Sequence, residues 1–122
     1  DRARRQPELL AYAEALEQAL QQVAVATRAA WATGVPAEAL ANAVPYLQAF
    51  GHTVLAWLWL EQARVAAQAL GARPHADEAA FLKGKLQACR YFCHWELPRT
   101  QAQYALLRTL DGTPLDMEAG WF

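Results

Sequence analysis

Cys89, Cys93 and His94 are the residues whose types and spacing come nearest to a metal site. Two cysteines four positions apart lie one turn apart on one face of a helix, where their thiolates could share a zinc ion. A structural zinc site needs four ligands, and His94 points about 100° away from the thiols. His52 or His75 would therefore have to complete the site. Buried thiols in a helix core are the favoured interpretation, and we expect no bound metal.

The histidines could also serve as catalytic bases. No acidic or nucleophilic residue lies at a spacing from His52 or His94 that is typical of a catalytic pair. We therefore favour a structural role for each histidine, as a hydrogen-bonded residue of the core or of an interface. His94 precedes Glu96 by two residues, which is the wrong order and spacing for the Glu-x-x-His pairs of a di-iron bundle. The chain contains no serine, which excludes a Ser-His-Asp triad. We expect no catalytic residue in this chain.

Three basic residues on one predicted helix, Lys83, Lys85 and Arg90, could contact phosphates such as those of coenzyme A or a flavin nucleotide. A solvated helix face is the favoured interpretation. The glycines never approach the G-x-G-x-x-G spacing, and Gly84-Lys85 is followed by leucine, so dinucleotide and P-loop sites are unsupported. The formal net charge of -1 favours neither nucleic acid nor an anionic membrane as a partner.

Aromatic residues are dense on two predicted helices. Residues 54–60 are apolar on every side, and a helix of that kind needs neighbours on every side. A bundle of this size covers about two sides, so the remainder is expected to meet another domain or subunit. Tryptophan and tyrosine are favoured at interfaces. The candidate interface residues are Trp57, Trp59, Tyr91 and Trp95, and Phe81 and Phe92 accompany them.

Proline and glycine divide the chain into helical segments. The pattern predicts helices over about residues 7–33, 36–70, 77–97 and 98–110, with a kink at Pro45 or a short helix before it. Gly84 lies within the third helix, where glycine costs about 1 kcal/mol relative to alanine. We expect it to permit the close approach of another helix. The short connections imply antiparallel neighbours.

Composition agrees with one helical domain. Hydrophobic residues make up 55% of the chain and charged residues 19%, which argues against disorder. Alanine is abundant and isoleucine absent, which favours helix over strand. The prediction is an all-α, up-and-down four-helix bundle over residues 1–122, with a kinked second helix and a short C-terminal tail. The longest apolar run is too short to cross a bilayer. We expect a cytoplasmic protein, and the opening without methionine suggests a piece of a longer one.

Two blocks of sequence carry a resemblance to a known family. The first is Ala-Asn-Ala-Val-Pro-Tyr-Leu-Gln-Ala-Phe-Gly-His at residues 41–52, which leads into the apolar run. The second is Phe-Leu-Lys-Gly-Lys-Leu at residues 81–86, followed by an aromatic pair and Glu-Leu-Pro at residues 96–98. With the closing Trp121-Phe122, these blocks resemble the C-terminal extension of bacterial acyl-CoA dehydrogenases, in the 3-methylmercaptopropionyl-CoA dehydrogenase-like subfamily. The resemblance covers about residues 5–122.

The resemblance implies a role within a larger enzyme. Members of that family use FAD and a catalytic carboxylate to convert acyl-CoA to 2,3-enoyl-CoA in fatty acid metabolism, and those parts lie upstream of the extension. No residue of this chain matches the catalytic glutamate or the flavin-binding motifs, so none is carried over. The extension is similar in position to the extra helical domain of very-long-chain acyl-CoA dehydrogenases. Its expected work is packing against the upstream catalytic domains or supporting a homo-oligomer.

Two other functions stay open at this point. The bundle could be a free-standing interaction module that dimerises through its aromatic face. It could also be a metal-binding bundle built on Cys89 and Cys93. These cysteines stand where the resemblance leads us to expect alanine or another small or apolar residue, which agrees with buried thiols.

Overall fold

The structure, a computed structural model, describes residues 2–122 and the side chains of residues 7–122. The predicted domain also includes Asp1, which lies outside the described residues. The long helices are α1 (Arg2–Ala30), α3 (Ala43–Leu70) and α4 (Ala76–Tyr91). The shorter elements are α2 (Pro36–Leu40), the π-helix η1 (Phe92–Glu96), the 3-10 helix η2 (Leu97–Arg99), α5 (Thr100–Arg108), α6 (Thr113–Asp116) and the 3-10 helix η3 (Ala119–Trp121). No strand occurs in residues 2–122, which confirms the all-α prediction.

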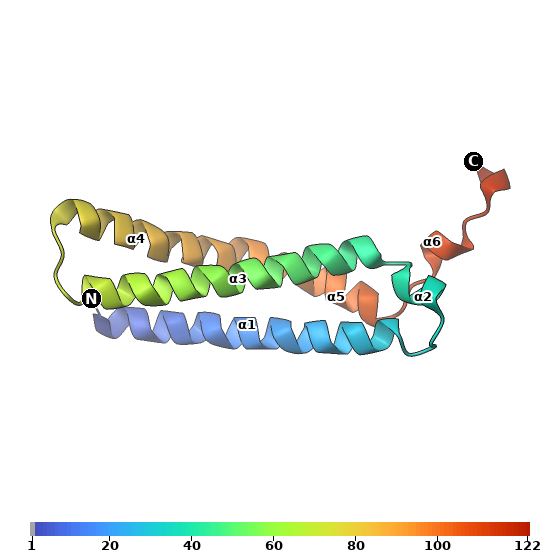
Figure 1. The fold of residues 1–122 in the computed structure, drawn as a ribbon, viewed down its shortest axis with the longest axis horizontal. Helices are drawn as coiled ribbons and strands as arrows, with labels where there is room; N and C mark the ends of the chain where they lie inside the picture. The colour runs from blue at the N-terminus through green and yellow to red at the C-terminus, as the bar shows by residue number, and fades with distance from the viewer. Residues whose placement is uncertain (1) are drawn as a thin grey trace.

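The bundle consists of three rods (Figure 1). α1 and α3 run antiparallel, and α4, η1, η2 and α5 follow one another end to end as a third, bent rod. The predicted four-helix arrangement is not confirmed, because Pro98 does not reverse the chain. The hydrogen-bond spacing changes from π-helical to 3-10 around Pro98, and this change accommodates the missing proline N–H while the rod continues without a reversal.

The predicted kink at Pro45 is not confirmed either, and the structure instead has the alternative of a short helix before the long one. A separate short helix, α2, precedes α3, and Asn42 stands between them. Pro45 lies in the first turn of α3, where a backbone N–H would have no partner within the helix. The buried Asn42 side chain donates a hydrogen bond to the carbonyl of Asp111 at 2.9 Å, which joins this break to the end of α5.

Small side chains occupy the inner face of α3. Its buried residues are Ala49, Thr53, Ala56, Ala63 and Ala66. Larger residues from the other rods pack onto these positions: Leu16, Phe92 and Leu97 around Ala56, Tyr104 and Leu107 in the cluster of Ala49, and Tyr12 and Cys89 in that of Ala63. Because alanine adds little bulk beyond the backbone, the neighbouring side chains reach close to the axis of α3.

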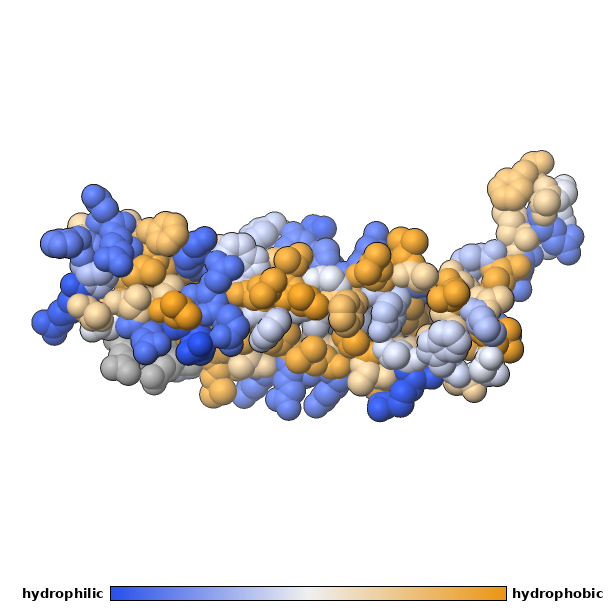
Figure 2. Space-filling view, viewed as in Figure 1, coloured by the Kyte–Doolittle hydropathy of each residue, from blue (hydrophilic) through white to orange (hydrophobic). Residues whose placement is uncertain are grey.

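Several large apolar side chains of α3 point outward instead. Leu47, Leu58 and Val65 are 69%, 43% and 54% exposed, and their spacing places them on one side of the helix. Figure 2 shows hydrophobic side chains along the middle of the bundle, where α3 runs. The inner and outer faces of α3 are therefore both apolar, but only the inner face is covered by this chain. No helix within residues 2–122 is long and apolar enough to span a membrane.

Gly84 does not make the predicted close contact. It is exposed on α4, and a Cβ atom built at this position would meet nothing within 4 Å in the described structure. The expectation of close helix packing at Gly84 is thus wrong for the contacts within this chain, because α4 turns a different face toward α3. The pattern of apolar residues alone did not distinguish these two faces.

Two buried tyrosines differ in their hydrogen bonding. The hydroxyl of Tyr104 lies 2.7 Å from Oγ1 of Thr53 and donates a hydrogen bond to the carbonyl of Ala49 at 3.0 Å. The hydroxyl of Tyr12 has no hydrogen-bond partner in the described part of the chain. Burial, assisted by the charge of Glu8, raises the pKa of Tyr12 to about 12. One tyrosine therefore ties α5 to α3, whereas the other loses its contact with water without compensation.

Two substitutions on α3 test which face of the helix is buried. One enlarges a buried residue and the other shortens an exposed residue. We expect Ala63→Leu to lower the free energy of unfolding by about 1–3 kcal/mol, because the buried site has no room for the added carbons. Leu58→Ala is expected to change it by less than about 0.5 kcal/mol in the 122-residue chain, because Leu58 packs outward. Urea unfolding followed by circular dichroism measures both. A larger loss from Leu58→Ala than from Ala63→Leu would contradict this assignment of faces.

Removing the hydroxyl of each buried tyrosine compares a hydrogen-bonded hydroxyl with an unpaired one. Tyr104→Phe is expected to lower the free energy of unfolding by about 1 kcal/mol, because it removes a buried hydrogen bond. Tyr12→Phe is expected to leave it unchanged or raise it by about 1 kcal/mol, because an unpaired buried hydroxyl is lost. The same unfolding measurement serves for both variants. Equal destabilisation by the two substitutions would show that the Tyr12 hydroxyl has a partner.

Candidate functional site

Tyr91 and Trp95, two of the four candidate interface residues, form an exposed aromatic pair. Tyr91 ends α4 and Trp95 lies in η1. Their ring centroids are 6.2 Å apart with an interplanar angle of 16°, which is a stacked arrangement. Trp95 is 66% exposed. The pair presents a flat aromatic surface of the kind that marks protein interfaces.

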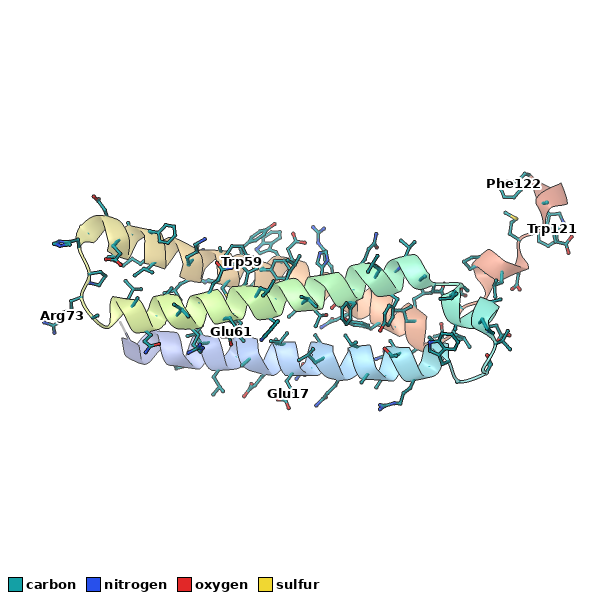
Figure 3. All side chains as sticks on the ribbon, in the orientation of Figure 1. Glu17, Trp59, Glu61, Arg73, Trp121 and Phe122 are labelled. Atoms are coloured by element: carbon teal, nitrogen blue, oxygen red, sulfur yellow. The ribbon has the colours of Figure 1, made fainter. Side chains whose placement is uncertain are left out.

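Trp57 and Trp59 do not join this pair in a single face. Two helix positions differ by about 200°, so the two tryptophans lie on different sides of α3. Trp57 is exposed. Trp59 is partly buried against two of the core clusters, on the side of α3 that faces α4 (Figure 3). The predicted aromatic face therefore divides into the Tyr91–Trp95 pair, the separate Trp57, and Trp59 in the packed interior.

A polar cluster centred on Glu96 lies beside the aromatic pair. Tyr91 donates a hydrogen bond to Oε1 of Glu96 at 3.0 Å. Nε2 of His52 and Nε of Arg99 lie 3.4 and 3.8 Å from Oε2, and Nδ1 of His52 is 3.2 Å from the carbonyl of Gln48. The cluster joins α3 to the third rod. Sequence reasoning missed it, because His52 and Glu96 are 44 positions apart and no local pattern connects them.

The cluster keeps Glu96 ionised. The hydrogen bond from Tyr91, together with the charge of Arg99 and the contact with His52, lowers the pKa of Glu96. The same bond raises the pKa of Tyr91. Both carboxylate oxygens are occupied by neighbouring side chains, and no serine, threonine or cysteine takes part. The cluster therefore has a structural arrangement that links α3 to the third rod. Its hydrogen bond to Tyr91 holds the exposed tyrosine ring in place.

The cysteines and His94 do not come together as metal ligands. Cys89 is fully buried beneath Tyr12, and Cys93 is partly buried. The hydrogen bond between the thiols raises the pKa of Cys89, with burial adding to the effect, and lowers that of Cys93. His94 points elsewhere, with its ring edge-on to Tyr12 at 5.9 Å. No group of three potential metal-binding side chains occurs in the described structure.

The basic residues of α4 have different environments. Nζ of Lys85 lies 5.1 Å from the ring centroid of Phe81 and 5.6 Å from that of Trp59. Its charge is therefore placed over two aromatic rings. Lys83 and Arg90 are exposed. The structure thus distinguishes Lys85 from the other two cations, which the sequence pattern treated alike.

A groove of about 340 Å³ runs between α1 and α5. Three glutamines and two alanines are among its lining residues, together with Leu97, Tyr104 and the partly buried Cys93. Its cation, Arg108, contacts the side-chain oxygen of Gln22. The groove has the volume of a small-ligand pocket, but it holds no carboxylate or histidine that could act as an acid or base there.

Comparison with known proteins gives two matches. The family described as "acetyl-CoA dehydrogenase C-terminal like" matches residues 1–118. The chain is also similar to the broad-specificity linear acyl-CoA dehydrogenase FadE5 of Mycobacterium tuberculosis, with 30% identity over 81 residues. That alignment covers 66% of this chain and 13% of the relative, so the chain corresponds to a small part of the relative's length.

The Glu96 cluster predicts a pH-dependent stability. A carboxylate with a lowered pKa in the folded state stabilises the fold above its unfolded pKa of about 4.3, and this contribution is lost as the pH falls through the folded pKa. We expect Glu96→Gln to reduce the free energy of unfolding at pH 7 and the difference from the unsubstituted chain to shrink below about pH 4. Urea unfolding at several pH values measures it. Glu17→Gln, at an exposed position on α1, is the control, and an equal pH profile for both variants would contradict the role of Glu96.

Proposed function

Because the chain belongs to the acetyl-CoA dehydrogenase C-terminal-like family, we propose that it is the non-catalytic C-terminal domain of an FAD-dependent acyl-CoA dehydrogenase. The observation that carries this proposal is the family match over nearly the whole chain. The similar dehydrogenase is far longer than this chain, which leaves most of such an enzyme for the catalytic domains. The Glu96 cluster supports a structural role, because its polar groups bind one another.

The parent enzyme is proposed to oxidise acyl-CoA to 2,3-enoyl-CoA in the cytoplasm as part of fatty acid metabolism. The sequence blocks at residues 41–52 and 81–86 favour the 3-methylmercaptopropionyl-CoA dehydrogenase-like subfamily. Residues 41–52 include Asn42, which anchors the end of α5, and the start of α3. These blocks therefore support a shared architecture of the domain more directly than a shared substrate.

The grooves formed by residues 7–122 do not fit the flavin itself. A flavin dinucleotide needs donors for its pyrophosphate, which proteins supply from glycine-rich turns, helix N-termini or cations. The groove between α1 and α5 offers Arg108, whose guanidinium already contacts Gln22. Lys85 lies over aromatic rings at another part of the surface. We therefore assign no step of the reaction to this chain.

The proposed role of the domain is to pack against the catalytic domains of the same protein. Trp57, Tyr91 and Trp95 are exposed aromatics that suit such an interface. The hydrogen bond from Tyr91 to Glu96 fixes one ring before binding, which reduces the entropy lost when the interface forms. The same surface could support assembly of a homo-oligomer.

A free-standing interaction module is the alternative function. The uncovered apolar face of α3 favours it, because exposed patches of this kind are uncommon on monomeric proteins. This alternative needs no catalytic domain and predicts that the 122-residue chain does not bind the catalytic part of a dehydrogenase. The two functions therefore differ in whether the Tyr91–Trp95 surface binds a catalytic domain.

Expressing the domain and the catalytic part of the parent as separate chains tests the proposal. We expect the two to associate, and we expect flavin absorbance to remain with the catalytic part. Tyr91→Ala with Trp95→Ala is expected to raise the dissociation constant about tenfold or more, because a central aromatic pair is removed. Trp31→Ala, at an exposed tryptophan beyond the end of α1, is the matched control.

Calorimetric titration of the catalytic part with each variant measures the effect. Absence of association with the unsubstituted domain would contradict the packing role. A purified domain that itself carries flavin would contradict the proposed absence of a cofactor site.

A further inference from the structure

Residues 113–122 form an apolar tail that this chain does not cover. The tail contains α6 and η3 and extends beyond the end of the bundle, with Trp121 and Phe122 at its tip (Figure 3). Phe122 is 96% exposed. The other exposed large apolar side chains of the tail are Leu115, Met117 and Trp121. A group of exposed apolar side chains of this kind is typical of a surface that binds a partner.

The base of the tail is fixed and its charge is negative. Asn42 binds the carbonyl of Asp111, and the Asp111 carboxylate accepts hydrogen bonds from the backbone and hydroxyl of Thr113, each at 3.1 Å. Residues 111–122 contain three acidic residues, completed by Asp116 and Glu118, and no lysine or arginine. A surface that covers this tail is therefore expected to be both apolar and basic.

A groove between α3 and α4 has those properties. It has a volume of about 330 Å³, and Val65, Phe81 and Leu82 supply apolar walls. Lys85 stands at its edge, and no carboxylate of residues 7–122 pairs with it. The acidic residue at the groove, Glu61, is paired with Arg64 at 3.2 Å. The groove thus offers aromatic packing and one cation that has no ionic partner among residues 7–122.

The tail cannot reach this groove within its own molecule. The tail leaves the bundle near the first residue of α3, whereas Val65 and Phe81 lie toward the opposite end (Figure 1). The stretch of α3 from residue 43 to residue 65 is about 33 Å long. Ten residues span that distance only when fully extended, and the tail contains helical turns. A second molecule aligned antiparallel brings the two features to the same end.

We propose that two copies of this chain associate antiparallel through the outer faces of α3, and that the tail of each lies in the α3–α4 groove of the other. The outer face of α3 lies between the tail and the groove, and it presents Leu47, Leu55 and Leu58 without covering. Gly51 lies on the same face, and a Cβ built there would meet nothing within 4 Å in the described structure. A second α3 therefore fits closely at this point.

The available surface matches the size of a stable dimer interface. Half-exposed leucine, valine and aromatic side chains each leave on the order of 100 Å² open. Val44, Leu47, Leu55, Leu58 and Val65 on α3 join the four apolar side chains of the tail. Together they approach the roughly 800 Å² that each partner buries in a standard interface. The proposed dimer interface includes neither Tyr91 nor Trp95. Dimer formation can therefore be tested independently of association with the catalytic domains.

Sedimentation velocity of the 122-residue chain over a range of concentrations tests the dimer. The expected result is a reversible dimer. Trp121→Ala with Phe122→Ala is expected to raise the dissociation constant about tenfold or more, because the aromatic anchors are lost from an exposed segment that the fold does not need. Leu10→Ala, at an exposed leucine of α1 outside the proposed interface, is expected to leave it unchanged. A monomer at every concentration, or a dimer that the tail variant does not weaken, overturns the proposal.

A charge exchange tests where the tail lies. Lys85→Glu alone, and Asp116→Lys with Glu118→Lys alone, are each expected to weaken the dimer several-fold at low salt. The chain that carries all three changes is expected to recover much of the lost affinity, because the attraction is restored with reversed signs. Circular dichroism checks that every variant keeps its helix content. If the chain with all three changes dimerises no more tightly than the weaker of the other two variants, the tail lies elsewhere. That result overturns the proposed docking in the groove.

Discussion

The small side chains on the inner face of α3 set the spacing of the whole domain. Four alanines and one threonine are the buried residues of that helix, and each of the three core clusters includes one of the alanines. The bulk of the core therefore comes from α1 and from the rod formed by α4, η1, η2 and α5. Replacing the inner alanines with larger residues would push both neighbours outward. Several large apolar residues of α3, among them Leu47, Leu58 and Val65, are left on the outer surface, where they are available to bind a partner.

The sequence predicted helix content well and the grouping of helices less well. Proline and glycine marked the main breaks, because their effects on the backbone are local. The same local rule separated the third and fourth predicted helices at Pro98, whereas the structure accommodates this proline within one rod by changing from π-helical to 3-10 spacing. That outcome depends on how the rod packs against α1 and α3. A pattern in the neighbouring residues does not contain this information.

The candidate surfaces show a similar limit. Trp57, Tyr91 and Trp95 are exposed in this chain, and their role as interface residues stays a prediction. Trp59 differs because its side of α3 is the one that α4 covers. The Glu96 cluster and the position of Lys85 over Trp59 were not predictable, since each joins residues far apart in the sequence. Apolar periodicity identified that α3 has too much hydrophobic surface for one bundle, but only the packing showed which side remains open.

The alanine-lined interior of α3 also affects how stability responds to temperature. Alanine has no side-chain rotamers to lose, so its burial costs no side-chain entropy, and it removes little apolar area from water. The leucines and valines of the outer face are exposed in the folded chain and gain little further exposure on unfolding. A small change in apolar exposure means a small heat-capacity increment of unfolding. For a domain of this length the stability curve is therefore expected to be shallow, with a broad thermal transition and little tendency to cold denaturation.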